Sequence, residues 1–269
     1  MSPIALLIIQ LIAVVVGPIL LAIWIRRRWQ ARWSALGWGA LAFVGSQAVR
    51  LPLLIGSSLI LNPYFIDADP NVLFWFNLVI LSLTAGLFEE GARYIVLRWP
   101  AKQVRRWNDG LMFGAGHGGI EAMLIVGLAA VNNIILLSLG DTLVDQTRAV
   151  APEQAAAVAA QLAELRNLAW WLPLIAVWER AMAITLHIAL SLLVMIAVRD
   201  RRRSLLFAAI ALHAIVNAVV GIVMRYGGII ASEAVLTLMT LLPLWIILRA
   251  RRADQQVTHA SAMPPATTP

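Results

Sequence analysis

Charged and imidazole side chains occur inside long apolar stretches of this sequence, where they are rare and costly. Placing an Asp, Lys or Arg at the centre of a spanning helix costs at least about 2.5 kcal/mol. The residues concerned are Glu89, Glu90, Arg93, His117, Glu121, Glu179, Arg180, His187, His213 and Asn217. Carboxylates and imidazoles can bind a divalent metal or carry protons, so this set indicates one of those two kinds of chemistry.

The spacing of these residues places several of them on shared helix faces. Three pairs are four residues apart: Glu89 with Arg93, His117 with Glu121, and His213 with Asn217. Residues at this spacing lie one turn apart on the same side of a helix. Three segments therefore each offer a two-residue polar face in an otherwise apolar surround.

The elements that must position these residues are membrane-spanning helices. The chain has 269 residues, of which 61% are hydrophobic and 13% charged, against roughly 45–50% and 25% in soluble domains. Seven stretches approach the length of about 20 apolar residues that a spanning helix needs. They are residues 3–25, 35–61, 72–97, 110–139, 168–198, 204–225 and 229–249. We predict an all-α, polytopic membrane helix bundle of about seven transmembrane helices.

The basic residues give the bundle an orientation. They cluster after the first, third, fifth and seventh stretches, whereas the other connections hold Arg148, Arg166 and Arg225. Because positive residues stay in the cytoplasm, the N-terminus is expected outside and the C-terminus in the cytoplasm. The net charge of +7 is thus a signal of topology, and we expect membrane lipids and no nucleic acid as partners.

The same orientation brings the polar residues into one layer. Counted from the cytoplasmic ends at about 1.5 Å per residue, Glu89 and Glu90 lie about 12–14 Å deep. His117 lies at about 11 Å, His213 at about 14 Å and His187 at about 17 Å. Glu179 is deeper, at about 28 Å. The layer is therefore expected in the cytoplasmic half of the bilayer.

Residues 1–252 are expected to form a single transmembrane domain. An Ala-rich external connection, residues 140–167, is predicted to be helical, and residues 253–269 to be a disordered cytoplasmic tail. Gly110, Gly114 and Gly118 are four residues apart. A stripe of this kind lets another helix approach closely, so His117 beside it is expected to face protein.

Two imidazoles and a carboxylate, with a fourth position open to water, form the catalytic zinc arrangement. The sequence has no cysteine, which excludes thiolate ligands and a cysteine nucleophile. Structural roles are the alternative for single members: Arg50 as a packing residue, Arg180 as an ion-pair partner of Glu179, and a lone histidine as a donor to a neighbouring helix.

Four strings of this sequence resemble a known family. They are Glu89-Glu90-Gly-Ala-Arg93, Gly116-His117-Gly-Gly-Ile-Glu121, Glu179-Arg180 with His187, and His213-Ala-Ile-Val-Asn217. Together they resemble the YhfC family of intramembrane metalloproteases and, more distantly, the PrsW proteases and the CAAX-processing and bacteriocin-immunity proteases. The resemblance implies a general base from the Glu pair and metal ligands from His117 and from His213 with Asn217. The arginine follows the Glu pair after two residues, as in PrsW.

We therefore expect a zinc-dependent intramembrane endopeptidase of the bacterial inner membrane. His117 and His213 are expected to bind Zn²⁺, and Glu121, Asn217 or His187 to complete or support the site. Glu89 is favoured over Glu90 as the base, with Arg93 as the charge partner of the pair. The substrate would be a membrane segment or a lipid-modified peptide, cut near the cytoplasmic half of the bilayer.

Two other classes of function fit the same polar layer. The chain could be a transporter, a proton relay or a haem-binding protein, because chains of Glu and His carry protons and paired histidines can ligate haem. It could also be a catalytically silent relative that acts as an immunity or scaffold protein.

Overall fold

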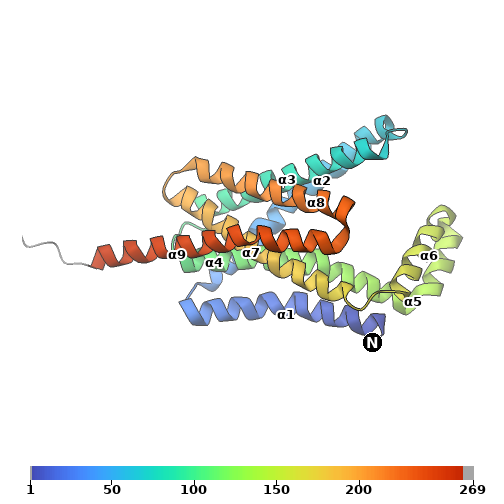
Figure 1. Ribbon diagram of the computed structural model, residues 1–269, viewed down its shortest axis with the longest axis horizontal. Helices are drawn as coiled ribbons and strands as arrows, with labels where there is room; N and C mark the ends of the chain where they lie inside the picture. The colour runs from blue at the N-terminus through green and yellow to red at the C-terminus, as the bar shows by residue number, and fades with distance from the viewer. Residues whose placement is uncertain (1, 263–269) are drawn as a thin grey trace, which may run out of the picture. The chain divides into compact units, whose positions relative to one another are not determined.

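The computed structural model describes residues 2–262, which are almost entirely helical and contain no strand (Figure 1). The expected all-α fold is thus confirmed. The elements are α1 (Pro3–Trp29), α2 (Trp33–Phe65), α3 (Pro70–Arg98), α4 (Trp107–Ala122), the π-helix η1 (Met123–Gly127), α5 (Leu128–Val150), α6 (Pro152–Arg166), α7 (Leu172–Arg199), α8 (Arg203–Met239) and α9 (Leu241–Ala262).

Six stretches of the described chain are long and apolar enough to cross a membrane. The last of them, Arg203–Gln256, reverses direction at Gly228, whose φ of +74° lies in the left-handed region that suits glycine. The Ser232 hydroxyl donates to the Val220 carbonyl at 3.2 Å across this reversal. The stretch therefore contains two passes, which correspond to the sixth and seventh predicted spans (Figure 1).

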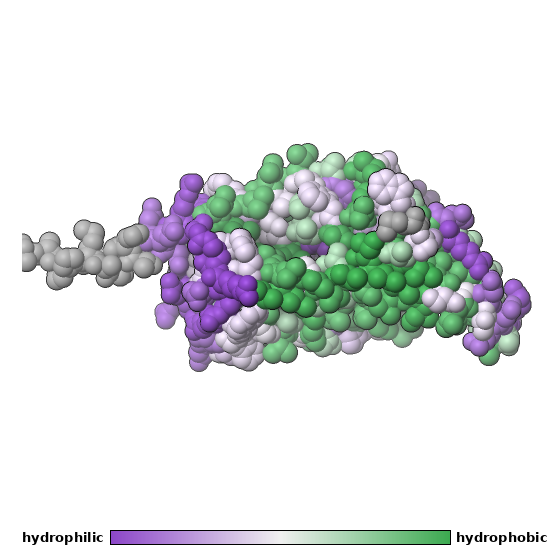
Figure 2. Space-filling model, turned by 90° about the horizontal axis from the view of Figure 1, so that it is seen from below, coloured by the Kyte–Doolittle hydropathy of each residue, from purple (hydrophilic) through white to green (hydrophobic). Residues whose placement is uncertain are grey.

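The outer faces of the helices carry apolar side chains. Leu59 and Ile60 of α2 are each 70% exposed, and Figure 2 shows a continuous hydrophobic face. A water-soluble protein rarely exposes so large an apolar surface, whereas lipid tails solvate it without penalty.

The chain separates into two compact units, where a single domain was expected. The first contains the residues up to Leu21 and Gly119–Ala181, and the second contains Ala22–Gly118 and the residues from Met182 onward. The first unit has its own apolar cluster, which explains why it is compact by itself. This cluster is formed by Leu136, Val144, Leu162 and Leu165.

Within the first unit, α5 and α6 form a helical hairpin. The predicted external helix is present as α6, with Pro152 in its first turn, where its missing N–H costs nothing. The preceding helix was expected to end near residue 139, but it continues to Val150. Its extra turns pack against α6, and Arg166 Nη2 pairs with Asp141 Oδ2 at 2.9 Å.

The last helix also runs farther than expected. A disordered tail was expected from residue 253, whereas α9 continues to Ala262. Ala, Gln and Arg are good helix formers, so these residues extend a helix that is already nucleated within the apolar segment. Residues 263–269 of the expected tail lie outside the described residues.

Glycines set the distances between the helices of the second unit. The predicted stripe on α4 faces α7: a Cβ on Gly114 would collide with the Ile188 backbone, and one on Gly118 would lie 3.1 Å from Ile184 Cα. On α3, a Cβ at Gly86 would lie 2.6 Å from the Ile210 carbonyl oxygen of α8. These contacts bring α3, α4, α7 and α8 close enough for short side chains to meet.

The α4–α7 contact predicts a strong effect of Gly114→Val. The new side chain must push the α7 backbone away, and overpacking of this kind costs about 1–3 kcal/mol. Gly45→Val on α2 is the matched control, because a Cβ there meets nothing within 4 Å. We expect a lower melting temperature in detergent for Gly114→Val alone, and equal melting of the two variants would contradict the packing.

Candidate metal centre

Helix α3 carries the acidic part of the site. Its first turn is fixed by Asp69, whose carboxylate accepts from the Asn71 backbone N–H at 2.7 Å. About five to six turns later the helix places three charged side chains in the interior. Glu89 is 4% exposed, whereas Glu90 and Arg93 are fully buried. Charges so deeply buried need partners, which the neighbouring helices provide.

Arg93 contacts three members of the site at once. Its Nη1 forms a very short ion pair with Glu90 Oε1, and its Nη2 lies 3.9 Å from Glu89 Oε2. Nη2 also lies 2.7 Å from His187 Nδ1 on α7. Because a guanidinium has donors and no acceptor, Nδ1 of His187 must accept, and the proton of the neutral ring is on Nε2.

His213 of α8 is oriented by the second carboxylate. Its Nδ1 lies 2.8 Å from Glu90 Oε1. Glu90 is paired with an arginine and is therefore an acceptor, so Nδ1 donates and the lone pair of the neutral ring is on Nε2. A carboxylate that holds a histidine in this tautomer is the usual support of a metal-binding imidazole.

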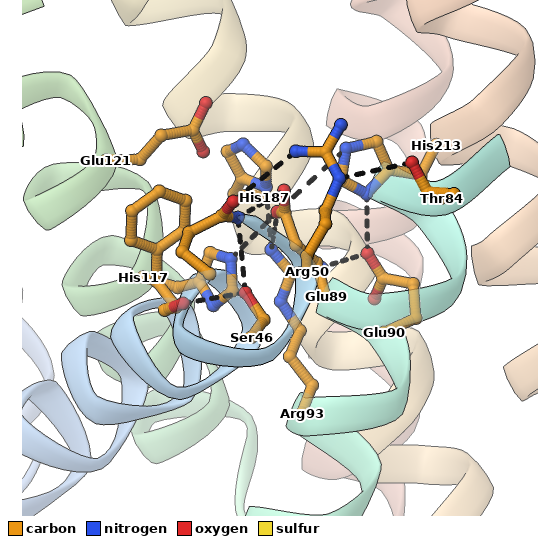
Figure 3. Close-up of polar contacts among 12 residues, drawn as sticks. Ser46, Arg50, Thr84, Glu89, Glu90, Arg93, His117, Glu121, His187 and His213 are labelled. Atoms are coloured by element: carbon orange, nitrogen blue, oxygen red, sulfur yellow. Dashed lines mark hydrogen bonds and ion pairs between the residues drawn. The ribbon is translucent and has the colours of Figure 1, made fainter. Parts of the chain in front are cut away.

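Two imidazoles converge on the other carboxylate. Nε2 of His117 lies 3.1 Å from Glu89 Oε2, and Nε2 of His213 lies 4.0 Å from the same oxygen. The ring of His187 lies between them, with its centroid 5.2 Å from that of His117 and 5.4 Å from that of His213. Figure 3 shows the side chains meeting from α3, α4, α7 and α8.

The donor set fits a divalent metal. Glu89, His117 and His187 each offer a ligand atom, and these atoms lie within 4.8 Å of one another. Imidazole nitrogens and a carboxylate are the ligands that zinc takes in catalytic sites. The tautomers distinguish His213 from His187. Nε2 of His213 has a lone pair to give, whereas His187, with Nδ1 on Arg93 and a proton on Nε2, can be a ligand only after one of these two changes.

Gln47 of α2 is a member of the site that the sequence reasoning missed. Its amide nitrogen donates to Glu89 Oε1 at 3.2 Å, whereas His117 contacts the other oxygen, Oε2. Gln47 Oε1 accepts from Arg50 Nη1 at 3.4 Å. The signal was a glutamine one turn before Arg50 in an apolar stretch.

Arg50 joins α2 to α3, which is consistent with the alternative that it is a packing residue. Its Nη2 donates to the Leu81 carbonyl at 3.0 Å, and its Nε donates to Thr84 Oγ1 at 3.2 Å (Figure 3).

The remaining predicted residues are Glu121, Glu179 and Arg180 of the first unit and Asn217 of α8. In the first unit, Arg180 forms an ion pair with Glu121 at 3.2 Å and a very short one with Glu179. Asn217 is half-buried one turn beyond His213 on α8, and within residues 2–262 its amide makes none of the hydrogen bonds described above.

Comparison with known proteins decides the family. The family model of the YhfC intramembrane metalloproteases matches residues 11–240. The chain belongs to the YhfC family. The membrane protein YhfC of Bacillus subtilis (strain 168) is 36% identical over 258 residues, which cover 88% of this chain and 92% of that protein.

The family match includes every residue of the site, from Gln47 to Asn217, together with Glu121, Glu179 and Arg180. This YhfC-family chain is a multi-pass integral membrane protein. No solved structure matches it.

The buried pair of Arg93 and Glu90 predicts strong coupling between the two. Arg93→Leu leaves a buried carboxylate without its countercharge and should cost about 3–5 kcal/mol of stability. The double variant Arg93→Leu/Glu90→Gln removes both charges and should melt at a higher temperature than Arg93→Leu alone. Tryptophan fluorescence in detergent measures this.

Arg148→Leu is the control for this comparison, because its pair with Asp145 is exposed and worth little. A double variant no more stable than Arg93→Leu would contradict the coupling.

Proposed function

We propose that this chain is an intramembrane metalloendopeptidase in which His117 and His213 hold the metal and Glu89 is the general base. The observation that carries the proposal is the approach of two imidazole Nε2 atoms to one carboxylate oxygen, Oε2 of Glu89, at 3.1 and 4.0 Å. Asn217, one turn from His213, is our candidate for a third ligand. The family to which the chain belongs supports this reading.

Zinc, the metal we favour, lowers the pKa of a bound water to roughly 7 and polarises a peptide carbonyl when it is bound. Glu89 takes the proton of the attacking water at Oε2 and delivers it to the leaving nitrogen. Gln47 holds the other oxygen, Oε1, so the carboxylate cannot rotate away. The N–H at Nε2 of His187, whose ring is oriented by Arg93, is our candidate donor to the carbonyl oxygen of the substrate.

The two adjacent carboxylates divide the work by environment. Adjacent residues of a helix point about 100° apart. Glu90 Oε1 receives both Arg93 and Nδ1 of His213, so Glu90 is occupied in orienting them. Glu89 faces His117 and has the weaker contact with Arg93, at 3.9 Å, which leaves it better able to accept a proton.

A groove between α2 and α3 supports an apolar peptide as the substrate. It encloses about 390 Å³ and is lined mainly by apolar side chains, including Leu61, Phe65 and Phe76. Leu81 is one of the residues that line the groove, and its carbonyl accepts from Arg50. Arg50 in turn contacts Gln47, which donates to Glu89. An apolar segment or a lipid-modified peptide lying there would point toward the base from within the bilayer, in the inner membrane of a bacterium.

Metal content distinguishes the roles of the three histidines. We expect about one zinc per chain in purified wild-type protein and its loss in His117→Ala and in His213→Ala. His187→Gln should keep the metal, because the glutamine oxygen still accepts from Arg93. Elemental mass spectrometry measures the ratio. A metal-free wild type after zinc reconstitution would leave a proton-carrying Glu–His network as the better reading.

Cleavage tests the base. Glu89→Gln should lower the kcat for a reporter transmembrane peptide in liposomes by about 10²–10⁴-fold while the bound metal remains. Glu179→Gln, the same exchange in the ion pair with Arg180, should cleave normally. Wild-type cleavage by Glu89→Gln would refute its role.

A further inference from the structure

A basic cavity lies at one end of the second unit, away from the metal centre. It encloses about 440 Å³ and is lined by Tyr94 and Arg98 of α3, Ala197 and Val198 of α7, Arg201 of the α7–α8 connection and Arg203 of α8. Three of the six lining residues are arginines. Within residues 2–262, none of the three forms an ion pair with a carboxylate. The nearest acid in sequence, Asp200, is neutralised by Arg199 at 2.7 Å.

The surroundings of two of the arginines suit an anion site. Arg98 Nη1 donates to the Tyr94 hydroxyl at 3.3 Å, and its guanidinium lies 5.9 Å from the centre of the Trp99 ring. Arg203 is the first residue of α8, where the unpaired N–H groups of a helix favour an anion. Three positive side chains therefore line one cavity, and one of them is the first residue of a helix.

Arg201 occupies a backbone position that favours glycine. Its φ is +56°, and the Arg202 N–H donates to the Ala197 carbonyl at 3.0 Å, which is the hydrogen bond of a Schellman turn. Glycine is the usual residue at the left-handed position of this turn, because a side chain there is strained.

We propose that this cavity binds the phosphate headgroup of an anionic phospholipid. The three arginines adjoin the ends of apolar spanning helices, where headgroups lie. Basic pockets between membrane helices bind such headgroups, and a volume of about 440 Å³ is within the range of small-ligand sites.

Lipid binding to the full chain tests the proposal. The protein in detergent is titrated with phosphatidylglycerol and, separately, with phosphatidylcholine of the same acyl chains, and native mass spectrometry counts the bound lipids. We expect one tightly held phosphatidylglycerol in the wild type and at least tenfold weaker binding in Arg98→Gln/Arg201→Gln/Arg203→Gln. The charge-matched control, Arg27→Gln/Lys102→Gln/Arg106→Gln, changes exposed residues outside the cavity and should bind as the wild type does.

Arg201→Gly separates binding from stability. Glycine relieves the left-handed backbone, so the melting temperature should rise by about 2–4 °C, yet phosphatidylglycerol binding should weaken. Gln30→Gly, at the other described non-glycine position of this kind on the α1–α2 connection (φ +54°), should raise the melting temperature with no change in binding.

Three results would overturn the proposal: unchanged phosphatidylglycerol binding in the cavity triple variant, an equal loss in the charge-matched control, or equal binding of phosphatidylcholine. Inorganic phosphate that displaces phosphatidylglycerol at equal concentration would assign the cavity to a soluble anion and would also overturn it.

Discussion

The arrangement of the site depends on the contacts of the Arg93 guanidinium. It is fully buried and contacts Glu90, Glu89 and His187. An arginine keeps its charge in any protein environment, so its position decides which neighbours are acceptors. It holds Glu90 as an anion, and Glu90 in turn orients His213. It also makes Nδ1 of His187 an acceptor. One side chain therefore sets the protonation pattern of two histidines on two different helices.

This arrangement requires helices that approach one another unusually closely. The stripe of Gly110, Gly114 and Gly118 lets α4 lie against α7, which brings His117 and His187 to 5.2 Å between ring centres. Gly86 does the same for α3 and α8, and thus for Glu90 and His213. Larger residues at these points would separate the rings from their carboxylates, because the side chains involved are short. The packing of the glycines therefore sets the distances between the side chains of the site.

The sequence predicted the parts of this design that depend on period and length. Apolar length gave the passes, and the rise of a helix placed Glu89, His117, His187 and His213 at similar depth, where the structure brings them together. The depth of a residue in the bilayer does not fix the rotation of its helix or the rotamer of its side chain. The sequence therefore could not choose between Glu89 and Glu90 as the close partner of Arg93. The structure gives that place to Glu90. Gln47 was missed for the same reason, because a single amide in a helix has no partner until the facing helix is known.

The two carboxylates of α3 and the two carboxylates of the first unit differ in how closely an arginine pairs with them. Glu121 and Glu179 both pair with Arg180, so each has a cation beside it. Glu90 has the same constraint from Arg93. Glu89 receives an amide, an imidazole and a more distant guanidinium, which orient it without committing it to a single strong cation. Among the four carboxylates, Glu89 therefore has the weakest pairing with an arginine, which is the environment that its proposed role as general base requires.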